Sequence, residues 1–434
     1  MPDKYNVLQN IDNENNFFFF FYNKFNRSNL LFIKKKNKKN FLNNIIFQII
    51  YLFISSKYLL LYNNDYGMEK YVNILKKKYK FNKILFFLNF KTKINYFNKY
   101  FKYKLLTFSI QDRIFFFNNK DKRLKKYTKN YLKNIDSKIS RDKRLRFLLK
   151  NYINNYLFHF MNDLVTSSEN IFRFLKKKKP SVILSRLTSN IGYSIAEISK
   201  KLEINSYIVS HASHVFNKDK LSMFDWLINS KSTINSMHSH VAAQSILSLE
   251  FLKKIKVKSK IINTGPIIFC HPTDENKLED YKKNFNKKII LHASTPKDII
   301  NFRAINYETT YDYIKNLNDQ ILSLSKRKDI FFIINFREYD FLKLNDFKYL
   351  LPKTENYKVD TNNSLKSLLK KCDYVSSYSS TVIEEGFFFG KDVILYDRNN
   401  IYRHISRNKI KYHKNKISKI HYCTNPKNLN KIFT

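Results

Sequence analysis

The sequence predicts an α/β fold of two doubly wound domains that face each other across a cleft. From Pro180 onward, short apolar runs alternate with longer amphipathic segments, the order expected of βαβ units in parallel sheets. A polar link at 274–287 divides this alternation into two series. At about 150 residues per domain, the 434 residues allow two or three domains. We therefore expect an N-terminal, acceptor-side domain at 1–266 and a C-terminal, ligand-binding domain at 267–434.

The first series is preceded by a half that is rich in Lys, Asn, Phe and Tyr and holds few motifs, residues 1–175. Its apolar stretch 41–62 contains Asn, Gln, Ser and Lys, whereas a membrane-spanning helix needs about 20 nearly uninterrupted apolar residues. This stretch therefore predicts a buried helix, with a surface-lying helix as the alternative. The spacing of apolar residues predicts strands at 83–88, 105–110, 181–185, 206–210, 226–228 and 261–264, and helices at 141–165, 191–202 and 241–253.

The second series follows the same alternation. Strands are expected at 288–292, 330–335, 374–376 and 392–396, and helices at 308–325, 364–371 and 382–389. In open α/β sheets, ligands bind outside the carboxyl ends of the strands. The polar residues that follow these strands are therefore the candidates for a binding site.

The charge of the chain is large, but it is a weak indication of function. The net charge of +45 comes from 80 Lys and Arg against 35 Asp and Glu. The chain has five Gly, where an average composition gives about 30. This skew suggests an AT-rich genome, so part of the charge follows from composition. Because Lys is scattered through every segment, we expect no specific nucleic-acid partner.

The cysteines and the N-terminal residues indicate a cellular location. Cys270, Cys372 and Cys423 have no CxxC spacing and are too few for a disulfide framework, which favours a reducing compartment. The apolar run 17–22 is too short for a secretory signal. We expect a cytoplasmic protein. Its basic first half also suits a peripheral position on anionic lipid at the inner face of the cytoplasmic membrane.

The segment 374–397 carries the most informative motif. Its strand ends in a run of hydroxyl residues, and a helix starts directly after Thr381. Thr381 and Glu384 have the spacing of a capping box. Unpaired N–H groups at a helix start favour a phosphate, so this turn is a candidate phosphate site. An ordinary capped helix that ends at Gly390 is the alternative.

With Glu385 and Gly390-Lys391 added, this motif resembles the C-terminal nucleotide-binding motif of GT-B glycosyltransferases. The likeness is greatest to those of bacterial surface polysaccharides, namely capsule, lipopolysaccharide and polysialic acid transferases and CDP-glycerol glycerophosphotransferases. It implies two Rossmann-like domains and a nucleotide-activated sugar as donor. The resemblance assigns a ribose contact to Glu385 and donor phosphate binding to Ser379, Ser380 and Thr381. UDP-sugar 2-epimerases carry a similar pair of glutamates followed by glycine, so they remain an alternative.

A second motif, at 185–215, ends a strand with His211 and His214, where related enzymes carry a His-Gly pair. A histidine there could accept the proton of an attacking acceptor hydroxyl. The resemblance therefore implies His211, and less directly His214, as the catalytic base, with hydrogen bonding inside a loop as the alternative. Ala212 follows His211, so the backbone freedom of glycine is absent. No carboxylate follows at metal-ligand spacing, and we expect no metal and no other cofactor.

Two further strand ends complete the expected donor site. The candidates at these strand ends are His292, Ser294, Thr295 and Arg337. Arg337 could bind a phosphate through two parallel hydrogen bonds. The resemblance expects a His-Pro pair after this basic residue, where the chain has Glu338-Tyr339, so the polysialyltransferase pattern is not matched. Gly265-Pro266 resembles the interdomain turn of GT-B proteins, with an ordinary strand-ending turn as the alternative.

These observations together predict a metal-independent glycosyltransferase of cell-envelope polysaccharide biosynthesis. It would move a sugar or a polyol phosphate from a nucleotide donor to a surface polysaccharide or a lipid-linked acceptor. One alternative is a UDP-sugar 2-epimerase, which would convert a free nucleotide sugar without any acceptor. A second alternative, from a different class, is a non-catalytic basic protein that binds nucleic acid or a membrane surface.

Overall fold

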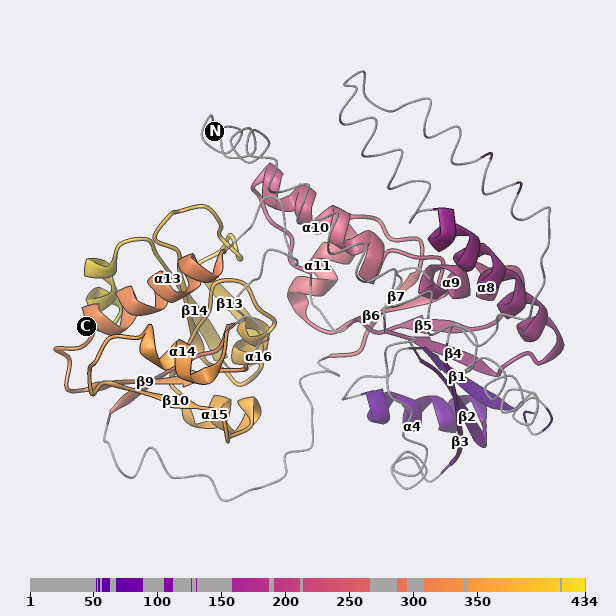
Figure 1. Cartoon of the computed structure of the whole chain (residues 1–434), viewed down its shortest axis with the longest axis horizontal. Helices are drawn as coiled ribbons and strands as arrows, with labels where there is room; N and C mark the ends of the chain where they lie inside the picture. Colours follow the sequence, from indigo (N-terminus) through magenta and orange to yellow (C-terminus); the bar gives the residue numbers. More distant parts are fainter. Residues whose placement is uncertain are drawn as a thin grey trace. The chain divides into compact units, whose positions relative to one another are not determined.

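The computed structural model describes residues 57–62, 68–88, 105–111, 158–186, 191–210, 214–265, 287–294, 308–338, 342–413 and 416–433, with isolated positions between 52 and 130. Within these ranges, helices and strands alternate and build two seven-stranded sheets (Figure 1). The predicted α/β class with two mainly parallel, doubly wound sheets is confirmed. The expectation that two domains face each other across a cleft stays a prediction.

The first sheet has the strand order β3-β2-β1-β4-β5-β6-β7. Its strands are β1 (Tyr58–Tyr62), β2 (Lys83–Leu88), β3 (Leu106–Gln111), β4 (Val182–Ser185), β5 (Ser206–Ile208), β6 (His240–Ala243) and β7 (Lys260–Asn263). The pairs β1–β2, β2–β3, β5–β6 and β6–β7 are parallel. The helices of this part are α4 (Met68–Tyr79), α8 (Phe158–Lys177), α9 (Ile191–Lys201), α10 (Lys220–Thr233) and α11 (Ile246–Lys254).

The second sheet has the order β10-β9-β8-β11-β12-β14-β13. Its strands are β8 (Lys288–His292), β9 (Ile330–Asn335), β10 (Tyr357–Asp360), β11 (Tyr374–Ser376), β12 (Asp392–Tyr396), β13 (Lys409–His413) and β14 (Lys416–Cys423). Neighbouring strands of this sheet pair in parallel except β13 and β14, which are antiparallel. The helices are α13 (Thr310–Ser323), α14 (Leu344–Tyr349), α15 (Leu365–Lys371), α16 (Val382–Phe388) and the 3₁₀ helix η3 (Pro426–Ile432).

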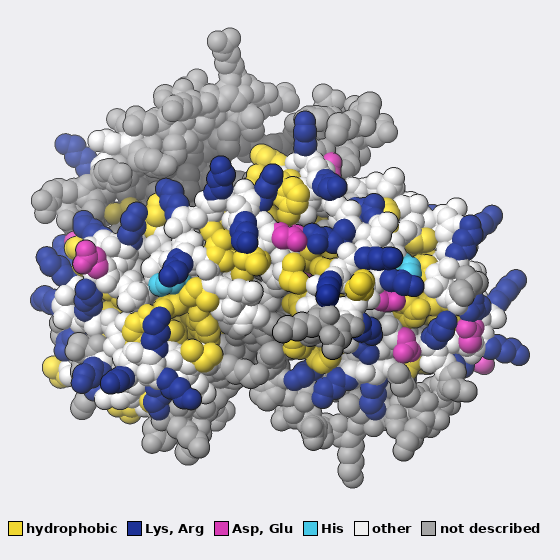
Figure 2. All heavy atoms as spheres, turned by 180° about the vertical axis from the view of Figure 1, so that it is seen from behind, with side chains coloured by type: hydrophobic (Ala, Val, Ile, Leu, Met, Phe, Trp, Pro, Cys, Tyr) yellow, Lys and Arg dark blue, Asp and Glu magenta, His cyan; other side chains and the backbone are white. Residues whose placement is uncertain are grey.

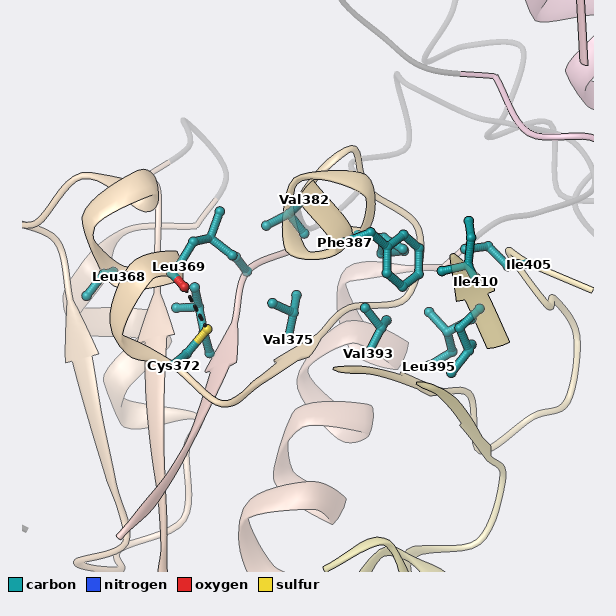
Figure 3. Close-up of a cluster of buried hydrophobic side chains, with 14 of the residues drawn as sticks. Leu368, Leu369, Cys372, Val375, Val382, Phe387, Val393, Leu395, Ile405 and Ile410 are labelled. Carbon is teal, nitrogen blue, oxygen red and sulfur yellow. Dashed lines mark hydrogen bonds between the residues drawn. The ribbon is translucent and has the colours of Figure 1, made fainter. Parts of the chain in front are cut away.

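Both faces of the second sheet are covered, because successive side chains of a strand point to opposite faces. On one face, α15 and α16 pack against alternate residues of the central strands, among them Val375, Val393 and Leu395 (Figure 3). Leu291 of β8 belongs to the same cluster. On the other face, the residues between these positions, such as Ile290 and Ile394, pack with η3. The carboxyl ends of β8 to β12 therefore lie between two layers of helices, where a ligand site is expected.

The described chain falls into two compact units whose boundary does not follow the sheets. One unit holds β1, β2, β3, α8 and α9, and the other holds α4, β5 to β7, α10, α11 and all elements from β8 onward. The division passes through β4, between Ile183 and Leu184. The strands of the first sheet all precede residue 266 and those of the second all follow it. A domain boundary at 266 nevertheless stays a prediction.

One expected element is wrong in type, and two others are wrong over part of their length. Residues 226–228 were expected as a strand but lie inside α10, since a three-residue apolar run does not distinguish a strand from a turn of a buried helix. The helix expected at 241–253 starts only at Ile246, because Ser245 caps α11 by accepting a hydrogen bond from Ser248 N at 2.9 Å. Residues 241–243, before this cap, belong to β6. Residues 58–62 of the apolar stretch 41–62 form β1, all five of them buried.

The long helix expected at 141–165 is confirmed only from Phe158, and it continues to Lys177. Residues 141–157 and most of 41–57 lie outside the described ranges, as does Pro266. Gly265 itself has a φ of +66°, which is the left-handed conformation of a tight turn. The interdomain role of this turn stays a prediction.

Basic side chains spread over the surface of the described chain and do not form one stripe on the face in view. Figure 2 shows Lys and Arg side chains scattered among hydrophobic, acidic and uncharged groups. This distribution agrees with a charge that follows from composition. No helix in the described part of the chain has both the length and the apolar content needed to span a membrane.

Candidate functional site

The second sheet has a topological switch point between β8 and β11. The chain goes from β8 to its neighbour β9 and on to the edge strand β10, then crosses back to β11 on the other side of β8. At such a point the connections leave the sheet in opposite directions, which opens a crevice at the carboxyl ends of the strands. Ligand binding is therefore expected where β8, β9 and β11 end.

A cavity of about 810 Å³ lies at this place, and we call it the carboxyl-edge cleft. Its volume is within the range of small-molecule sites, about 300–1,000 Å³. Its lining residues follow β8, β9, β10 and β11 and are Ala293, Ser294, Asn335, Phe336, Arg337, Glu338, Leu344, Thr361, Asn363, Ser364, Leu365, Ser380, Thr381, Val382 and Glu385. These described residues combine hydroxyl and amide groups with one guanidinium and two carboxyl groups, which suits a polar, charged ligand.

The turn between β11 and α16 supplies the hydroxyl groups of the cleft. The last residue of β11 before this turn is held in place, because Ser376 Oγ donates a hydrogen bond of 2.6 Å to Gln320 Oε1 on α13. Ser380 and Thr381 line the cleft, whereas Ser379 is half-buried beside them and is not part of the lining. The structure thus brings two of the three predicted phosphate-binding hydroxyls to one cavity.

The capping box expected from Thr381 and Glu384 is wrong. Thr381 already has helical angles, φ −59° and ψ −20°, and its side chain makes no cap hydrogen bond. The hydroxyl that accepts at this helix start is that of Ser380, from Val382 N at 3.4 Å. The helical turn begins one residue earlier than the sequence pattern indicates, so the hydroxyl of Thr381 is not needed to cap the helix.

The two glutamates of α16 have different surroundings. Glu384 is 0% exposed, whereas Glu385, one helical turn after Thr381, lines the carboxyl-edge cleft. Burial, and secondarily the charge of Glu384, raise the pKa of Glu385 to about 7. Within the described chain, its carboxyl group has no side-chain hydrogen-bond partner. A carboxyl group in this state could hold or release a proton at neutral pH.

The ends of β9 and β10 form the opposite wall of the cleft. Arg337 follows β9 with an exposed side chain, and Glu338 Oε1 accepts a hydrogen bond of 3.0 Å from Leu344 N, at the start of α14. After β10, the Asp360 carboxylate accepts from Asn362 N at 2.9 Å and from Asn363 N at 2.8 Å. This compact turn holds Asn363 at the cleft.

The end of β8 contributes Ser294, but not His292, to the lining. His292 is 4% exposed, and its ring lies 5.6 Å from that of Tyr313 on α13. Burial lowers the pKa of His292 to about 4. A direct contact of this ring with a ligand in the cleft would require it to turn away from Tyr313. Thr295 lies outside the described residues, so the roles proposed for both remain predictions.

The candidate bases lie elsewhere in the chain. His211 is outside the described residues. His214 is 2% exposed, hydrogen-bonded through Nε2 to Thr233 Oγ1 at 2.7 Å, with its ring 5.4 Å from those of Trp226 and Phe251. This is the environment of a histidine packed into a core. Its assignment as a base stays a prediction, and a substrate would reach it only after these contacts had opened.

Sequence reasoning missed part of the cleft. The polar lining residues to which it gave no role in binding are Asn335, Glu338, Thr361, Asn363 and Ser364. Asn335 and Glu338 carry the same signal as Arg337, since they end or follow a predicted apolar strand. Thr361, Asn363 and Ser364 follow β10, whose short sequence with a central lysine was not recognised as a strand.

Together, the fold and the carboxyl-edge cleft define an α/β protein with a polar ligand site at the switch point of an open sheet. No family model matches the chain, and no curated protein sequence matches it.

Several solved structures are similar to the chain in fold. The UDP-GlcNAc 2-epimerase of Methanocaldococcus jannaschii, in complex with UDP-GlcNAc and UDP, has 13% identity and a TM-score of 0.48, covering 87% of this chain and 91% of that one. The UDP-GlcNAc 2-epimerase of Neisseria meningitidis, bound to UDP-GlcNAc, has 14% identity and a TM-score of 0.41, with coverages of 78% and 82%. The glycosyltransferase SnogD of Streptomyces nogalater has 10% identity and a TM-score of 0.43, with coverages of 79% and 81%. Similarities of this size leave the function to be argued from the site.

Proposed function

We propose that this chain is an enzyme of nucleotide sugars, and specifically a metal-independent glycosyltransferase. It would transfer a sugar or a polyol phosphate from an activated nucleotide donor to a surface polysaccharide or a lipid-linked acceptor. The observation that supports this proposal is the composition of the carboxyl-edge cleft, which joins one guanidinium group to two helix-start hydroxyls at a switch point. Open α/β sheets bind nucleotides at such points.

Each kind of group in the cleft would have its own part in donor binding. Arg337 and the hydroxyls of Ser380 and Thr381 would hold the diphosphate, with the guanidinium balancing its charge. The side-chain amides of Asn335 and Asn363 on the opposite wall would bind hydroxyl or base groups. Ser294 and Ser379 would complete the phosphate contacts. Positive charge placed by Arg337 would stabilise the departing diphosphate.

The acceptor side of the proposal rests on sequence alone. His211 would act as the base that accepts the proton of the acceptor hydroxyl, with the acceptor bound to the part of the chain before residue 266. A cell-envelope pathway, a cytoplasmic location and contact with anionic lipid complete the proposal. A flotation assay with anionic liposomes tests the last point, and a chain that stays unbound would remove it.

The decisive experiment is nucleotide binding to the full chain and to the variant Ser379→Ala/Ser380→Ala. Selective thermal stabilisation by one of CMP, CDP, UDP and GDP is expected, since a ligand that binds the folded state stabilises it. Loss of the hydrogen bond from Ser380 to a charged group, at about 1.5 kcal/mol, should weaken binding by at least about tenfold, and a contact from Ser379, which lies beside the lining, would add to this loss. Ser325→Ala, at an exposed serine beyond α13, is the matched control. Undiminished binding and turnover in the double variant would contradict the phosphate assignment.

One observation favours a UDP-sugar 2-epimerase as a second candidate. Epimerisation needs a group that moves a proton inside the cleft, and Glu385, with its pKa near 7, is such a group. Product analysis separates the two candidates. An epimerase converts a free nucleotide sugar in the absence of any acceptor, whereas a transferase leaves the sugar moiety unchanged until an acceptor is added.

A further inference from the structure

Among the residues that the structure describes, the carboxyl-edge cleft has little positive charge, although the chain as a whole is strongly basic. The described lining contains the carboxyl groups of Glu338 and Glu385 and one guanidinium group, that of Arg337. The full chain carries 80 Lys and Arg against 35 Asp and Glu. With both carboxyl groups ionised, the cleft would present a net negative lining to the doubly charged diphosphate of a nucleotide sugar.

The helix that carries Glu385 has mainly apolar neighbours in the described chain. α16 packs through Val382, Ile383 and Phe387 against β11, β12 and β13, where Val375, Val393, Leu395 and Ile410 belong to the same hydrophobic cluster (Figure 3). Leu365 from α15 belongs to the same cluster. The charged group nearest along the helix is the fully buried Glu384. Lys416 reaches this helix only at its far end, beside Gly390.

Two opposing effects act on the carboxyl group of Glu385. The start of a helix favours an ionised carboxylate, with a typical worth of about 0.3–1 kcal/mol. Burial and the negative charge of Glu384 act in the other direction, and they prevail, since the pKa rises to about 7. A phosphate bound in the same cavity adds a further negative charge, which disfavours the ionised form still more.

We propose that Glu385 meets the ligand as a neutral carboxylic acid and donates its O–H to an acceptor oxygen of the ligand. The cleft then takes up its anionic ligand only when this proton is in place. The inference rests on the proposed function, which supplies a phosphate-bearing ligand. It differs from the ribose contact that the family resemblance implies, in which an ionised carboxylate would accept hydrogen bonds from the ligand.

The two roles predict opposite dependences of affinity on pH. If only the acid binds, the apparent affinity is reduced by the fraction of chains that hold the proton. With a pKa of about 7, that fraction falls from about 0.9 at pH 6 to about 0.1 at pH 8. The affinity should therefore fall about tenfold over this range. An ionised acceptor would give an affinity that rises with pH.

Isothermal titration calorimetry of the full chain at pH 6, 7 and 8 tests the proposal. The probes are UDP-N-acetylglucosamine, GDP-mannose and CDP-glycerol, because their diphosphates are diesters that keep their charge across this range. Glu385→Gln keeps a neutral donor in place, so its affinity should lie near that of the unchanged chain at pH 6 and should be the same at pH 8. Glu385→Ala should bind weakly at every pH, and Glu355→Gln, an exposed site outside the cleft, should keep the tenfold fall.

The outcomes separate this inference from the function on which it rests. A chain that binds none of the three probes at any pH contradicts the proposed function, and this inference with it. Binding with an affinity that stays constant or rises from pH 6 to pH 8 overturns the inference and leaves the proposed function intact. The same holds if Glu385→Gln, shown by its melting curve to be folded, loses binding as completely as Glu385→Ala.

Discussion

Replacing Glu385 by Gln should remove a pH-dependent part of the free energy of unfolding. The pKa of this carboxyl group rises from 4.5 to about 7 on folding, so the folded chain holds the proton more tightly than the unfolded chain. The stability that accompanies the proton is fully present below pH 4.5 and is lost as pH rises through 7. At 1.36 kcal/mol per pH unit, the full loss is about 3 kcal/mol, of which about 2.5 kcal/mol falls between pH 5 and pH 8. Relative to the unchanged chain, Glu385→Gln should gain that 2.5 kcal/mol over the same interval.

Urea unfolding followed by circular dichroism at pH 5, 6, 7 and 8 measures this difference. Other groups titrate in the same range, but they are common to both chains and cancel in the comparison. Glu355→Gln, an exposed carboxylate between α14 and β10, is the control and should follow the unchanged chain. A constant difference between Glu385→Gln and the unchanged chain from pH 5 to pH 8 would refute the argument, because Glu385 would then not be held neutral by its surroundings.

Three further predictions concern the local structure, and each is tested by the effect of substitutions on the free energy of unfolding. Gly390 has a φ of +65°, so Gly390→Ala should lower the free energy of unfolding by about 1–2 kcal/mol. Gly265→Ala, at a φ of +66°, should lower it by less, because its new methyl group meets no described atom within 4 Å, whereas that of Gly390→Ala lies 2.9 Å from the side chain of Lys416. Ser380→Ala should lower the free energy of unfolding by about 1 kcal/mol, because this hydroxyl accepts a hydrogen bond at the helix start, and Thr381→Ala should change it little. A larger loss in Thr381→Ala than in Ser380→Ala would indicate that Thr381 caps the helix after all. The pKa of His292 lies near 4 in the folded chain, so stability is lost as pH falls from 6.5 towards 4. His292→Leu should therefore lose about 3 kcal/mol less of its free energy of unfolding than the unchanged chain over this pH range. If the variant and the unchanged chain lose the same amount as pH falls, His292 is not buried as a neutral ring.

Strands that are apolar and bounded by polar residues could be predicted from the sequence to the residue. β8, β9 and β12 lie where the apolar runs indicated, since each is a buried run of the length typical of a strand. β10, β13 and β14 were missed because lysines interrupt their apolar residues. β1 was misassigned for the opposite reason: Tyr58–Tyr62 is buried at every position, so no period separates it from a buried helix.

The candidate site was predictable where it follows recognised strands. Ser294, Arg337, Ser380, Thr381 and Glu385 were named from the sequence, and all of them line the carboxyl-edge cleft. The other half of the wall was not predictable, because it depends on β10 lying next to β9, which is a fact of topology. Likewise, only the three-dimensional structure shows that one of two adjacent glutamates is fully buried while the other faces the cleft.

The lysines on the edge strands give the scattered charge of this chain a physical role. Three of the four edge strands of the described sheets, β7, β10 and β13, carry exposed lysines, namely Lys260, Lys358, Lys409 and Lys411, whereas the edge strand β3 has none. An edge strand presents unpaired N–H and C=O groups that can recruit a strand from another molecule, and lysines are a common protection against such pairing. In a chain with 40 Phe and 30 Tyr, compositional drift towards lysine would thus also guard against aggregation. A version of this protein with its charge engineered towards neutrality should lose solubility before it loses its fold.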